Sequence, residues 1–493
     1  MSTTDSLVPG VKTTSVPEEV LKAFKSEAKA DPTFTETLNK HLLKYDNGKW
    51  NGVGYAFTRD NQLPDNWLLQ TPNVWGMPAD KVPIGAGKFV ADELLQLITS
   101  AQQFIDITTL HPYPDGEFEK VIRQGLKTLA HAKRHVIVRI LGGWSPIDFG
   151  ENQRKYLERL ITDLKPIEGA HLQIYVGAQR TTEWSWNHAK MVAVDGRAAM
   201  VGGENLWAGD YLQSEPVHDL NIALNGSIVY YMHKFTDYTW KNVCSYVEPG
   251  WHSVYWASGD DYVIEACLAE SPVTKQTGPG KMPVLGAGRY GSLGDVYGNP
   301  ADVAMLLCFS YAQSSIYIAQ QDIIISEGPL FKGWHQGMKE LAKALIRGVN
   351  VYIVISNDYA KAGSGNSYSA STVHETAKAI LHYVKEEENA PIGDKLVEMM
   401  CSRLHLSTLR FSSSKNWPNG YEFANHAKFF MIDDTVFYVG SENLYPSDLI
   451  EYGVFISDPD AVKTMKTKYW DPLWYYSKAV AISGSDAPTC VYK

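Results

Sequence analysis

Two kinds of apolar pattern follow one another along the chain, in the same order in each half. Segments with apolar residues at every third or fourth position predict amphipathic helices, and shorter, continuously apolar runs predict buried strands. In the first half we expect helices at 91–103 and 117–133 and strands at 104–114, 135–143 and 171–179. In the second half we expect helices at 302–314 and 330–348 and strands at 315–323, 349–358 and 404–412. This alternation predicts an α/β fold whose sheets are buried on both faces.

The doubled order of elements predicts a pseudo-dimer within one chain. At 493 residues the chain is long enough for two lobes with separate cores. We expect a flexible N-terminus at 1–20, a first lobe at 21–250, a connecting region at 251–300 and a second lobe at 301–493.

Two segments are rich in small residues. The segment 274–300 contains many Gly and Pro residues, so we do not expect regular structure to continue for long within it. The segment 357–371 is rich in Gly and Ser and follows a predicted strand. We favour lids or binding loops for both. The alternatives are a plain linker for the first and a mobile surface loop for the second.

Net charge and apolar run lengths exclude some classes of protein. The formal net charge is −10, and no basic runs are seen, which argues against a protein that wraps nucleic acid. No apolar run approaches the ~18–20 residues needed to span a bilayer. The first residues, MSTTDSLVPGVKTTS, contain neither a basic n-region nor an apolar h-region, so no signal peptide is visible.

The five cysteines are Cys244, Cys267, Cys308, Cys401 and Cys490. None lies in a C-x2-C pair, which argues against a zinc cluster. The odd number leaves at least one thiol free or in an intermolecular bond. Cys244 and Cys267 are close in sequence. If the protein is exported, they either form a disulfide or remain unbonded to each other, and the sequence leaves both outcomes open.

One short segment occurs twice. Residues 187–207 (NHAKMVAVDGRAAMVGGENLW) and 425–445 (NHAKFFMIDDTVFYVGSENLY) align without a gap and are identical at ten of 21 positions. The shared polar residues are His188, Lys190, Asp195 and Asn205 in the first copy and His426, Lys428, Asp433 and Asn443 in the second. Two copies of one polar constellation predict two half-sites that meet to form one site.

Strand parity separates the roles of these residues. Side chains at i and i+2 of a strand share a face, so His188 and Lys190 should point the same way, as should the matching pair in the second copy. Asp195 lies seven positions after His188 and precedes Gly196, a strong turn signal. We therefore interpret Asp195 and Asp433 as structural anchors of the turns.

A paired set of His, Lys and Asn suits phosphoryl transfer. One neutral His can attack phosphorus and form a phosphohistidine. The other can protonate the leaving alkoxide and then deprotonate the incoming water or alcohol. The two Lys and two Asn side chains can stabilise the non-bridging oxygens, so the mechanism requires neither a metal nor another cofactor.

An attacking His needs a hydrogen-bond acceptor at its second ring nitrogen. Asp219 opens the predicted strand 219–224, and Glu451 opens the predicted strand 451–456. They lie 31 and 25 residues after the His of their own copies. We expect each acid to orient that His and so extend its own half-site. The alternative is a pair of ordinary acids at strand edges.

These residues resemble the phospholipase D superfamily, whose signature is two H-x-K-x4-D motifs. The chain is also similar to the secreted bacterial phospholipases D of the Streptomyces type over roughly 65–480, in WLLQTPNVWG (67–76), LHPYPDGEFE (110–119), WNHAKMVAVDG (186–196), GSENLYPSDLIEYGVFI (440–456) and DPLWYYS (471–477). The resemblance implies two similar α-β-α-β-α lobes with the active site at their interface. It also implies an exported enzyme that hydrolyses phosphatidylcholine to phosphatidate and choline, and that transfers the phosphatidyl group when an alcohol is present.

The resemblance further implies individual roles. His188 corresponds to the nucleophile and His426 to the general acid and base, while the orienting carboxylates fall at Asp219 and Glu451. Glu451 is a departure, because the Streptomyces type usually has Asp there. The aromatic residues that contact choline correspond to Trp207 or Tyr211 and to Tyr368 in the Gly/Ser segment, and an aromatic cage suits a quaternary ammonium.

Three other functions compete with a lipid phosphodiesterase. A nuclease with the same motif is disfavoured by the acidic charge and the length of the chain. A phospholipid synthase such as cardiolipin synthase usually carries transmembrane segments. A binding module without catalysis would not need two intact His residues. The expected partners are a phospholipid surface or micelle and a water or alcohol acceptor, with the chain acting as a monomer and no nucleic acid bound.

Overall fold

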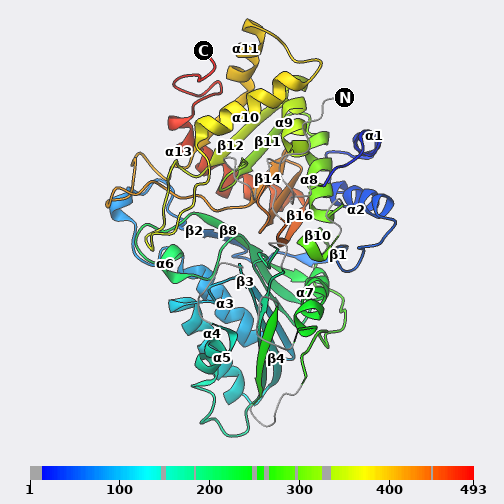
Figure 1. Cartoon of the computed structure of the whole chain (residues 1–493), viewed down its shortest axis with the longest axis vertical. Helices are drawn as coiled ribbons and strands as arrows, with labels where there is room; N and C mark the ends of the chain where they lie inside the picture. The colour runs from blue at the N-terminus through cyan, green and yellow to red at the C-terminus, as the bar shows by residue number, and fades with distance from the viewer. Residues whose placement is uncertain are drawn as a thin grey trace.

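The structure is a computed structural model that describes residues 14–145, 152–181, 185–246, 253–259, 266–294, 298–324, 335–445 and 448–493 (Figure 1). Residues 1–13 of the predicted flexible N-terminus and residues 330–334 of a predicted helix lie outside this description. Within the described residues, 16 strands form one mixed sheet that runs through the whole molecule.

The same order of strands occurs twice in this sheet. The first half contains β3 (Phe104–Leu110), β4 (His135–Gly143), β5 (His171–Gln179), β6 (Met191–Val194), β7 (Ala198–Gly202) and β8 (Asp219–Gly226). The second half contains β11 (Ser315–Ala319), β12 (Asn350–Ile355), β13 (Leu404–Thr408), β14 (Phe429–Ile432), β15 (Val436–Gly440) and β16 (Ile450–Ile456). The orders are β5-β4-β3-β6-β7-β8 and β13-β12-β11-β14-β15-β16. In each, the first three strands are parallel and the others pair antiparallel.

Two central strands join the halves. β1 (Tyr55–Gln62) pairs with β8 of the first half, and β10 (Met282–Tyr290) pairs with β16 of the second half. β1 and β10 pair with each other, which makes the sheet continuous. β2 (Leu68–Thr71) also pairs with β8, and β9 (Val254–Gly259) lies at the edge beside β5.

The prediction of irregular structure over 274–300 is wrong for β10. This strand of nine residues is buried at the centre of the sheet. Its glycines permit close packing of aromatic rings: a Cβ atom at Gly286 would lie 2.1 Å from the Tyr452 hydroxyl, and one at Gly288 would lie 2.3 Å from the Phe235 ring. In this strand, Gly marks close approach of neighbouring groups and not a turn.

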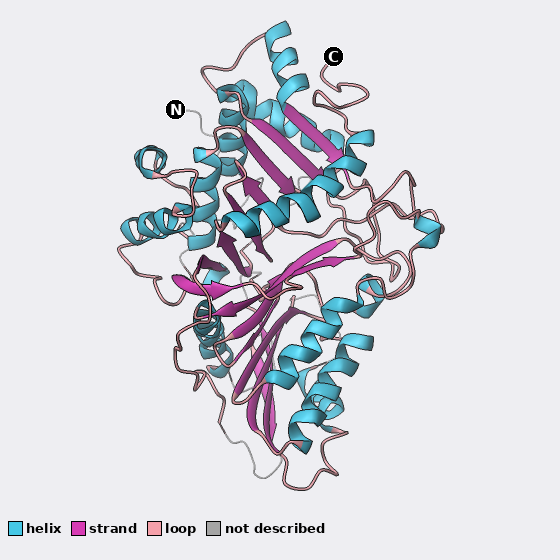
Figure 2. Cartoon of the chain, turned by 180° about the vertical axis from the view of Figure 1, so that it is seen from behind, coloured by secondary structure: helices cyan, strands magenta, loops and turns pink. Residues whose placement is uncertain are grey.

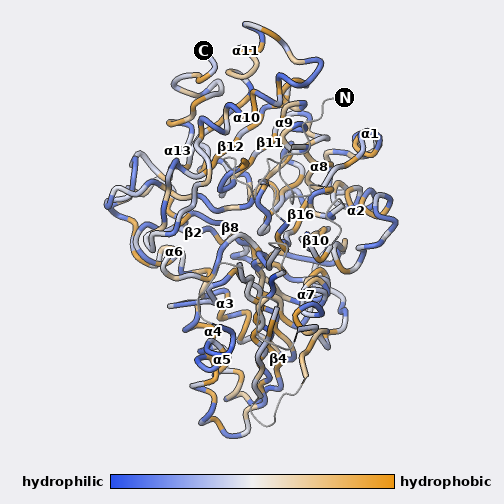
Figure 3. Tube along the Cα trace, in the orientation of Figure 1, coloured by the Kyte–Doolittle hydropathy of each residue, from blue (hydrophilic) through white to orange (hydrophobic). Residues whose placement is uncertain are grey.

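Helices cover both faces of the sheet (Figure 2). In the first half these are α3 (Lys88–Ser100), α4 (Gly116–His131), α5 (Gln153–Ile161), α6 (Ala208–Tyr211) and α7 (Ile228–Cys244). In the second half they are α8 (Pro300–Tyr311), α9 (His335–Arg347), α10 (Val373–Glu386), α11 (Asp394–Arg403), α12 (Pro459–Met465) and α13 (Asp471–Ser477). Apolar and polar residues alternate along the covering helices α9 and α10 (Figure 3), as an amphipathic helix requires. None of the described helices is long and apolar enough to cross a membrane.

The first described residues pack on the second half of the molecule. Thr14 and Val16 are buried, and the Thr14 hydroxyl donates a hydrogen bond to Asp302 at 2.7 Å. The helices α1 (Glu18–Glu27) and α2 (Phe34–Tyr45) lie beside α8 (Figure 1). Within the predicted flexible segment 1–20, residues 14 and 16 are therefore buried against the second half, and residues 18–20 belong to α1.

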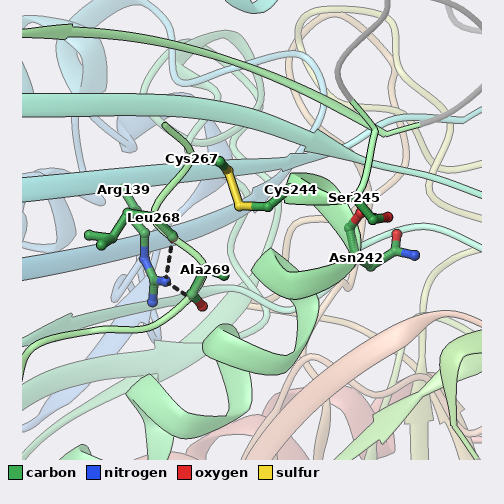
Figure 4. Close-up of a disulfide and its surroundings, with 7 residues drawn as sticks. All are labelled: Arg139, Asn242, Cys244, Ser245, Cys267, Leu268 and Ala269. Carbon is green, nitrogen blue, oxygen red and sulfur yellow. Dashed lines mark hydrogen bonds between the residues drawn. A yellow bond between two sulfur atoms is a disulfide. The ribbon is translucent and has the colours of Figure 1, made fainter. Parts of the chain in front are cut away.

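Two disulfides close loops at the periphery. Cys244 at the end of α7 forms a disulfide with Cys267 (Figure 4), a bond that the sequence had left open. Arg139 from β4 donates to the carbonyl oxygens of the next two residues after Cys267, at 3.1 and 3.2 Å. The sequence did not reveal the second disulfide, Cys401–Cys490, because its cysteines are 89 residues apart.

Candidate active site

The duplicated segments enter the sheet from opposite halves. His188 and Lys190 lie just before β6, and the matching pair of the second copy lies just before β14, so the catalytic candidates precede the strands that were expected to carry them. The backbone N–H of His188 donates to the Ile450 carbonyl at 2.7 Å. The backbone N–H of His426 donates to the His218 carbonyl, also at 2.7 Å. Each segment therefore pairs with the start of a strand from the other half.

Because of this pairing, each histidine contacts the carboxylate of the other half. Glu451 follows Ile450, and its carboxylate oxygens lie 2.9 and 3.0 Å from Nδ1 of His188. Asp219 follows His218, and its Oδ2 lies 2.7 Å from Nδ1 of His426. The expectation that each acid orients the histidine of its own half is wrong, because the register across the interface places each acid beside the other half's histidine.

Burial sets the protonation of the two histidines. It lowers the pKa of His188 to about 4, although the Glu451 carboxylate acts to raise it. Burial also holds the pKa of His426 well below the usual value. Both imidazoles are therefore neutral near pH 7, and a neutral imidazole is the form that can attack phosphorus.

The two carboxylates differ in charge. Burial raises the pKa of Asp219 to about 7, although Lys428 and a backbone N–H act to lower it. Burial also opposes ionisation of Glu451, but His188, Lys190 and Arg289 outweigh it, so the pKa of Glu451 is lowered. The two half-sites are consequently not equivalent near neutral pH.

A different hydroxyl group supports each acid. The Ser441 hydroxyl donates to Glu451 Oε2 at 2.6 Å, and the Tyr211 hydroxyl donates to Asp219 Oδ2 at 3.0 Å. The residue that matches Ser441 in the first copy is Gly203, where a Cβ atom would lie 2.3 Å from Asp219 Oδ1. The shorter acid, Asp219, thus lies beside Gly203, and the longer acid, Glu451, lies beside Ser441.

The two lysines are held in matching ways. The Nζ of Lys190 donates to the His188 carbonyl at 2.7 Å, and the Nζ of Lys428 donates to the His426 carbonyl. An ammonium has three donors, so each lysine keeps donors for a bound anion. Burial lowers the pKa of Lys428 to about 8 and that of Lys190 well below its ordinary value.

The two asparagines carry buried polar atoms without partners. Among the described residues, neither side-chain polar atom of Asn443 nor Oδ1 of Asn205 has a hydrogen-bond partner. Buried polar groups are nearly always paired in folded proteins, so an unpaired amide is suited to a ligand.

The motif aspartates lie in turns remote from the histidines. Asp195 accepts hydrogen bonds from the backbone N–H groups of residues 102–104, at 2.7 to 2.9 Å. Asp433 accepts the equivalent bonds from residues 313–315, each at 2.8 Å. Each carboxylate thus ties its turn to the junction between a helix and the next strand.

The three candidate aromatic residues differ in position. Trp207 is half-buried, and its indole N–H donates to the Pro112 carbonyl at 2.7 Å. Tyr211 is fully buried, and its hydroxyl lies within 3.0 Å of both Asp219 and His426. The ring of Tyr368 meets the His426 ring edge to face at 5.0 Å. Trp207 is therefore partly exposed, whereas Tyr211 is buried.

Asp210 of α6 fastens the Gly/Ser segment of the second half. It accepts hydrogen bonds from the Ser364 hydroxyl, from the Asn366 amide at 3.0 Å and from the Tyr368 hydroxyl. The segment 357–371 is thus held against the first half beside His426.

Sequence reasoning missed several neighbours of the acids. Glu204 and Glu442, at matching positions of the duplicated segment, are buried close to the acids' strands. The repeat itself contained this signal. Arg289 and Thr71 lie on strands outside the repeat, so nothing in the duplicated segment pointed to them. In the part of the chain that the structure describes, no three His, Cys, Asp or Glu side chains are grouped to bind a metal ion.

Comparison with known proteins adds three findings. Residues 306–474 match a family described as "Cardiolipin synthase, PLD-like domain". The chain is 30% identical over 466 residues to a phospholipase D of Streptomyces antibioticus, an alignment that covers 86% of this chain and 83% of that protein. The fold is similar to the crystal structure of phosphatidylserine synthase from Haemophilus influenzae, with a TM-score of 0.55 and 14% identity over 86% of this chain and 88% of that one.

Proposed function

Because the chain belongs to the phospholipase D family, we propose that it hydrolyses phosphatidylcholine-type glycerophospholipids at the bond between phosphate and headgroup alcohol. The products are phosphatidate and choline. With another alcohol as acceptor, the same site transfers the phosphatidyl group to that alcohol.

One observation carries this proposal. Two buried histidines, one from each half, are each held at Nδ1 by a carboxylate of the other half. A carboxylate at Nδ1 fixes the tautomer whose lone pair is on Nε2. In this tautomer His188 can act as the nucleophile, whereas His426 can donate a proton from Nε2 when its pair with Asp219 holds one proton more.

In the first step, Nε2 of His188 attacks phosphorus. A P–N bond forms while the bond from phosphorus to the choline oxygen breaks. The pair formed by His426 and Asp219 supplies the proton that the leaving alkoxide takes up. Lys190, Lys428 and the amides of the two asparagines stabilise the charge on the non-bridging oxygens.

In the second step, a water molecule or an alcohol enters where choline left. His426 removes its proton while the oxygen attacks phosphorus, and the P–N bond breaks. His188 returns to its neutral form, and the proton that left with choline is replaced by the one from the acceptor.

Trp207 and Tyr368 are the aromatic residues assigned to the choline headgroup. Trp207 presents exposed ring surface, and Tyr368 packs against His426, the proton donor to the headgroup oxygen. A quaternary ammonium is attracted to the faces of aromatic rings. Tyr211, whose hydroxyl is bound to Asp219, positions that acid.

The two disulfides support export as part of this proposal. Disulfides persist mainly in oxidising compartments, outside the cytosol. The structure contains the two disulfides Cys244–Cys267 and Cys401–Cys490. An exported enzyme would meet its substrate at a phospholipid surface or in micelles.

The proposal is tested with phosphatidylcholine vesicles and, separately, DNA, both with a chelator present. We expect choline release from the vesicles, and loss of that release in His188→Ala. Cleavage of DNA without choline release would overturn the proposal in favour of a nuclease.

The covalent step is tested by acid quenching during turnover of lipid labelled in its phosphatidyl moiety. We expect the label on the peptide that contains His188. Label on the peptide that contains His426 would reverse the two assigned roles while leaving the activity itself in place.

A further inference from the structure

The two orienting acids face different residues across the sheet. Glu451 on β16 lies directly opposite Arg289 on β10. Asp219 on β8 lies directly opposite Thr71 on β2. Residues directly opposite in an antiparallel pair have their side chains on the same face, with Cβ atoms about 4.5–5.5 Å apart. Arg289 and Thr71 therefore occupy corresponding places behind the two acids.

Both residues also contact the glutamate of the duplicated segment. Arg289 Nη2 lies 2.5 Å from Glu442 Oε1, and it also meets the buried carboxylate of Asp302. The Thr71 hydroxyl donates to Glu204 Oε2 at 2.6 Å. One arrangement is thus built twice, with a guanidinium in the second half and a neutral hydroxyl in the first.

The surroundings of Glu451 include groups of both signs. His188 and Ser441 form hydrogen bonds with its carboxylate, and Arg289 faces it from β10. Among the described residues, Lys190, Lys428, Glu442, Tyr438 and Tyr445 also act on it. Burial raises the pKa of Glu442 well above its ordinary value, and Asp302 and Glu451 act in the same direction, while Arg289, which contacts Glu442 as well, acts to lower it.

We propose that Arg289 is the positioning residue that makes the two half-sites different, because it keeps Glu451 ionised beside His188 while Thr71 gives Asp219 no comparable support. This inference rests on the proposed function. Arg289 acts through Glu451 and has no contact with substrate in the proposed reaction.

The consequence is a division of labour between the histidines. An ionised Glu451 accepts a hydrogen bond from the Nδ1–H of His188, so Nε2 of His188 keeps its lone pair for attack. Asp219 lacks a cation in the place of Arg289, and the pKa of Asp219 is raised to about 7 by burial. The Asp219–His426 pair can therefore hold the extra proton that the leaving alkoxide requires.

The test is the pH dependence of single-turnover labelling of His188, measured in the full-length protein by acid quenching and peptide mapping. In the wild type, the acidic limb should lie below about pH 5, near the ordinary range of a carboxyl. An acidic limb at pH 6 or above in the wild type would by itself overturn the inference.

Two substitutions of Arg289 distinguish the effect of its charge from the effect of its shape. Arg289→Gln keeps hydrogen-bond donors without the charge, and its acidic limb should move up by about one pH unit or more. Arg289→Lys keeps the charge and should stay near the wild type. Thr71→Val is the matched variant of the other half and should leave the acidic limb in place.

Folding is checked by thermal melting, since loss of Arg289 leaves Asp302 buried without its cation. If Arg289→Gln does not fold, the double variant Arg289→Gln/Asp302→Asn removes both charges and should show the same shift. If the acidic limb of either folded variant lies at the same pH as that of the wild type, the inference is overturned. Absence of any labelled histidine in the wild type would instead count against the proposed function.

Discussion

At the scale of single residues, the site depends on two hydrogen bonds that cross between the halves. His188 pairs with Glu451, and His426 pairs with Asp219. The acids differ in length, and the first half has Gly203 where the second half has the hydroxyl of Ser441. Substitutions that neutralise Asp219 or Glu451 should therefore affect the activity in different ways.

The first prediction concerns the choice of leaving group. With phosphatidylcholine, Glu451→Gln and Asp219→Asn should each lower the rate about 10²–10⁴-fold. With a nitrophenol headgroup, which leaves without being protonated, Asp219→Asn should recover most of the first-turnover burst. Glu451→Gln should not recover it, because its partner His188 makes the attack. Nitrophenol absorbance in a stopped-flow instrument measures the burst.

His426→Ala is the matched comparison for Asp219→Asn, and His188→Ala is the comparison for Glu451→Gln. Asp219→Asn should respond to the change of leaving group as His426→Ala does. Glu451→Gln should respond as His188→Ala does. Recovery in Glu451→Gln and none in Asp219→Asn would mean that each acid serves the histidine of its own half during turnover.

The second prediction concerns the alkaline side of the pH profile. Burial lowers the pKa of Lys428 to about 8, so this lysine loses its proton and its charge as the pH rises through that value. For the nitrophenol substrate, kcat/KM should therefore fall above about pH 8. Lys428→Arg, whose side chain stays charged throughout, should lower the maximum and move this limb to higher pH. An alkaline limb unchanged in Lys428→Arg would assign the titration to another group.

At the scale of elements, a short helix of the first half holds a loop of the second half. Asp210 lies in α6, which contains only four residues, yet its carboxylate accepts hydrogen bonds from Ser364, Asn366 and Tyr368. The same loop places the Tyr368 ring on His426. Substrate binding should therefore depend on a contact that is remote from the histidines in sequence.

The third prediction is that Asp210→Ala loosens this loop. Hydrogen bonds to a carboxylate contribute about 1.5–3 kcal/mol each, so their loss should raise KM about tenfold, with a smaller change in kcat. Hydrogen–deuterium exchange should increase in peptides that cover residues 360–368. Asp80→Ala, at a carboxylate that is 62% exposed in the short 3-10 helix Ala79–Lys81, should change neither quantity. A KM equal to that of the wild type would show that the loop is held by other contacts.

Helices and strands with strong periodicity were predictable, whereas β10 was not. The helix expected at 117–133 is observed as α4 (Gly116–His131), and the strand expected at 135–143 is β4 with the same bounds. In β10 the glycines hid the strand pattern, because their reason for being there is an aromatic ring on a distant segment. No pattern within 274–300 contains that information.

At the scale of the whole molecule, two disulfides cross-link positions that are 23 and 89 residues apart in the chain. Cys401–Cys490 spans 89 residues and fastens the C-terminus to α11, whereas Cys244–Cys267 spans 23 residues. A longer closed loop removes more entropy from the unfolded chain.

The fourth prediction follows from these spans. Replacing both cysteines of the longer loop by Ser should lower the free energy of unfolding by about 4–5 kcal/mol, against about 3 kcal/mol for the shorter loop. Urea unfolding without reductant measures the two losses. With reductant present, wild type and both variants should converge. A larger loss for the shorter loop would show that native contacts around Arg139 outweigh loop closure.

The sequence by itself determined the doubled plan of the fold, the residue types of the site and the family. These were predictable because repetition, periodicity and motif spacing are local properties of the chain. Only the tertiary structure decided which acid orients which histidine. The backbone pairing of His188 with Ile450 and of His426 with His218 joins residues more than 200 positions apart, and no local pattern encodes such a register. The pairing of β10 with β16 and of β2 with β8 places Arg289 behind one acid and Thr71 behind the other, which is why two similar segments form two unequal half-sites.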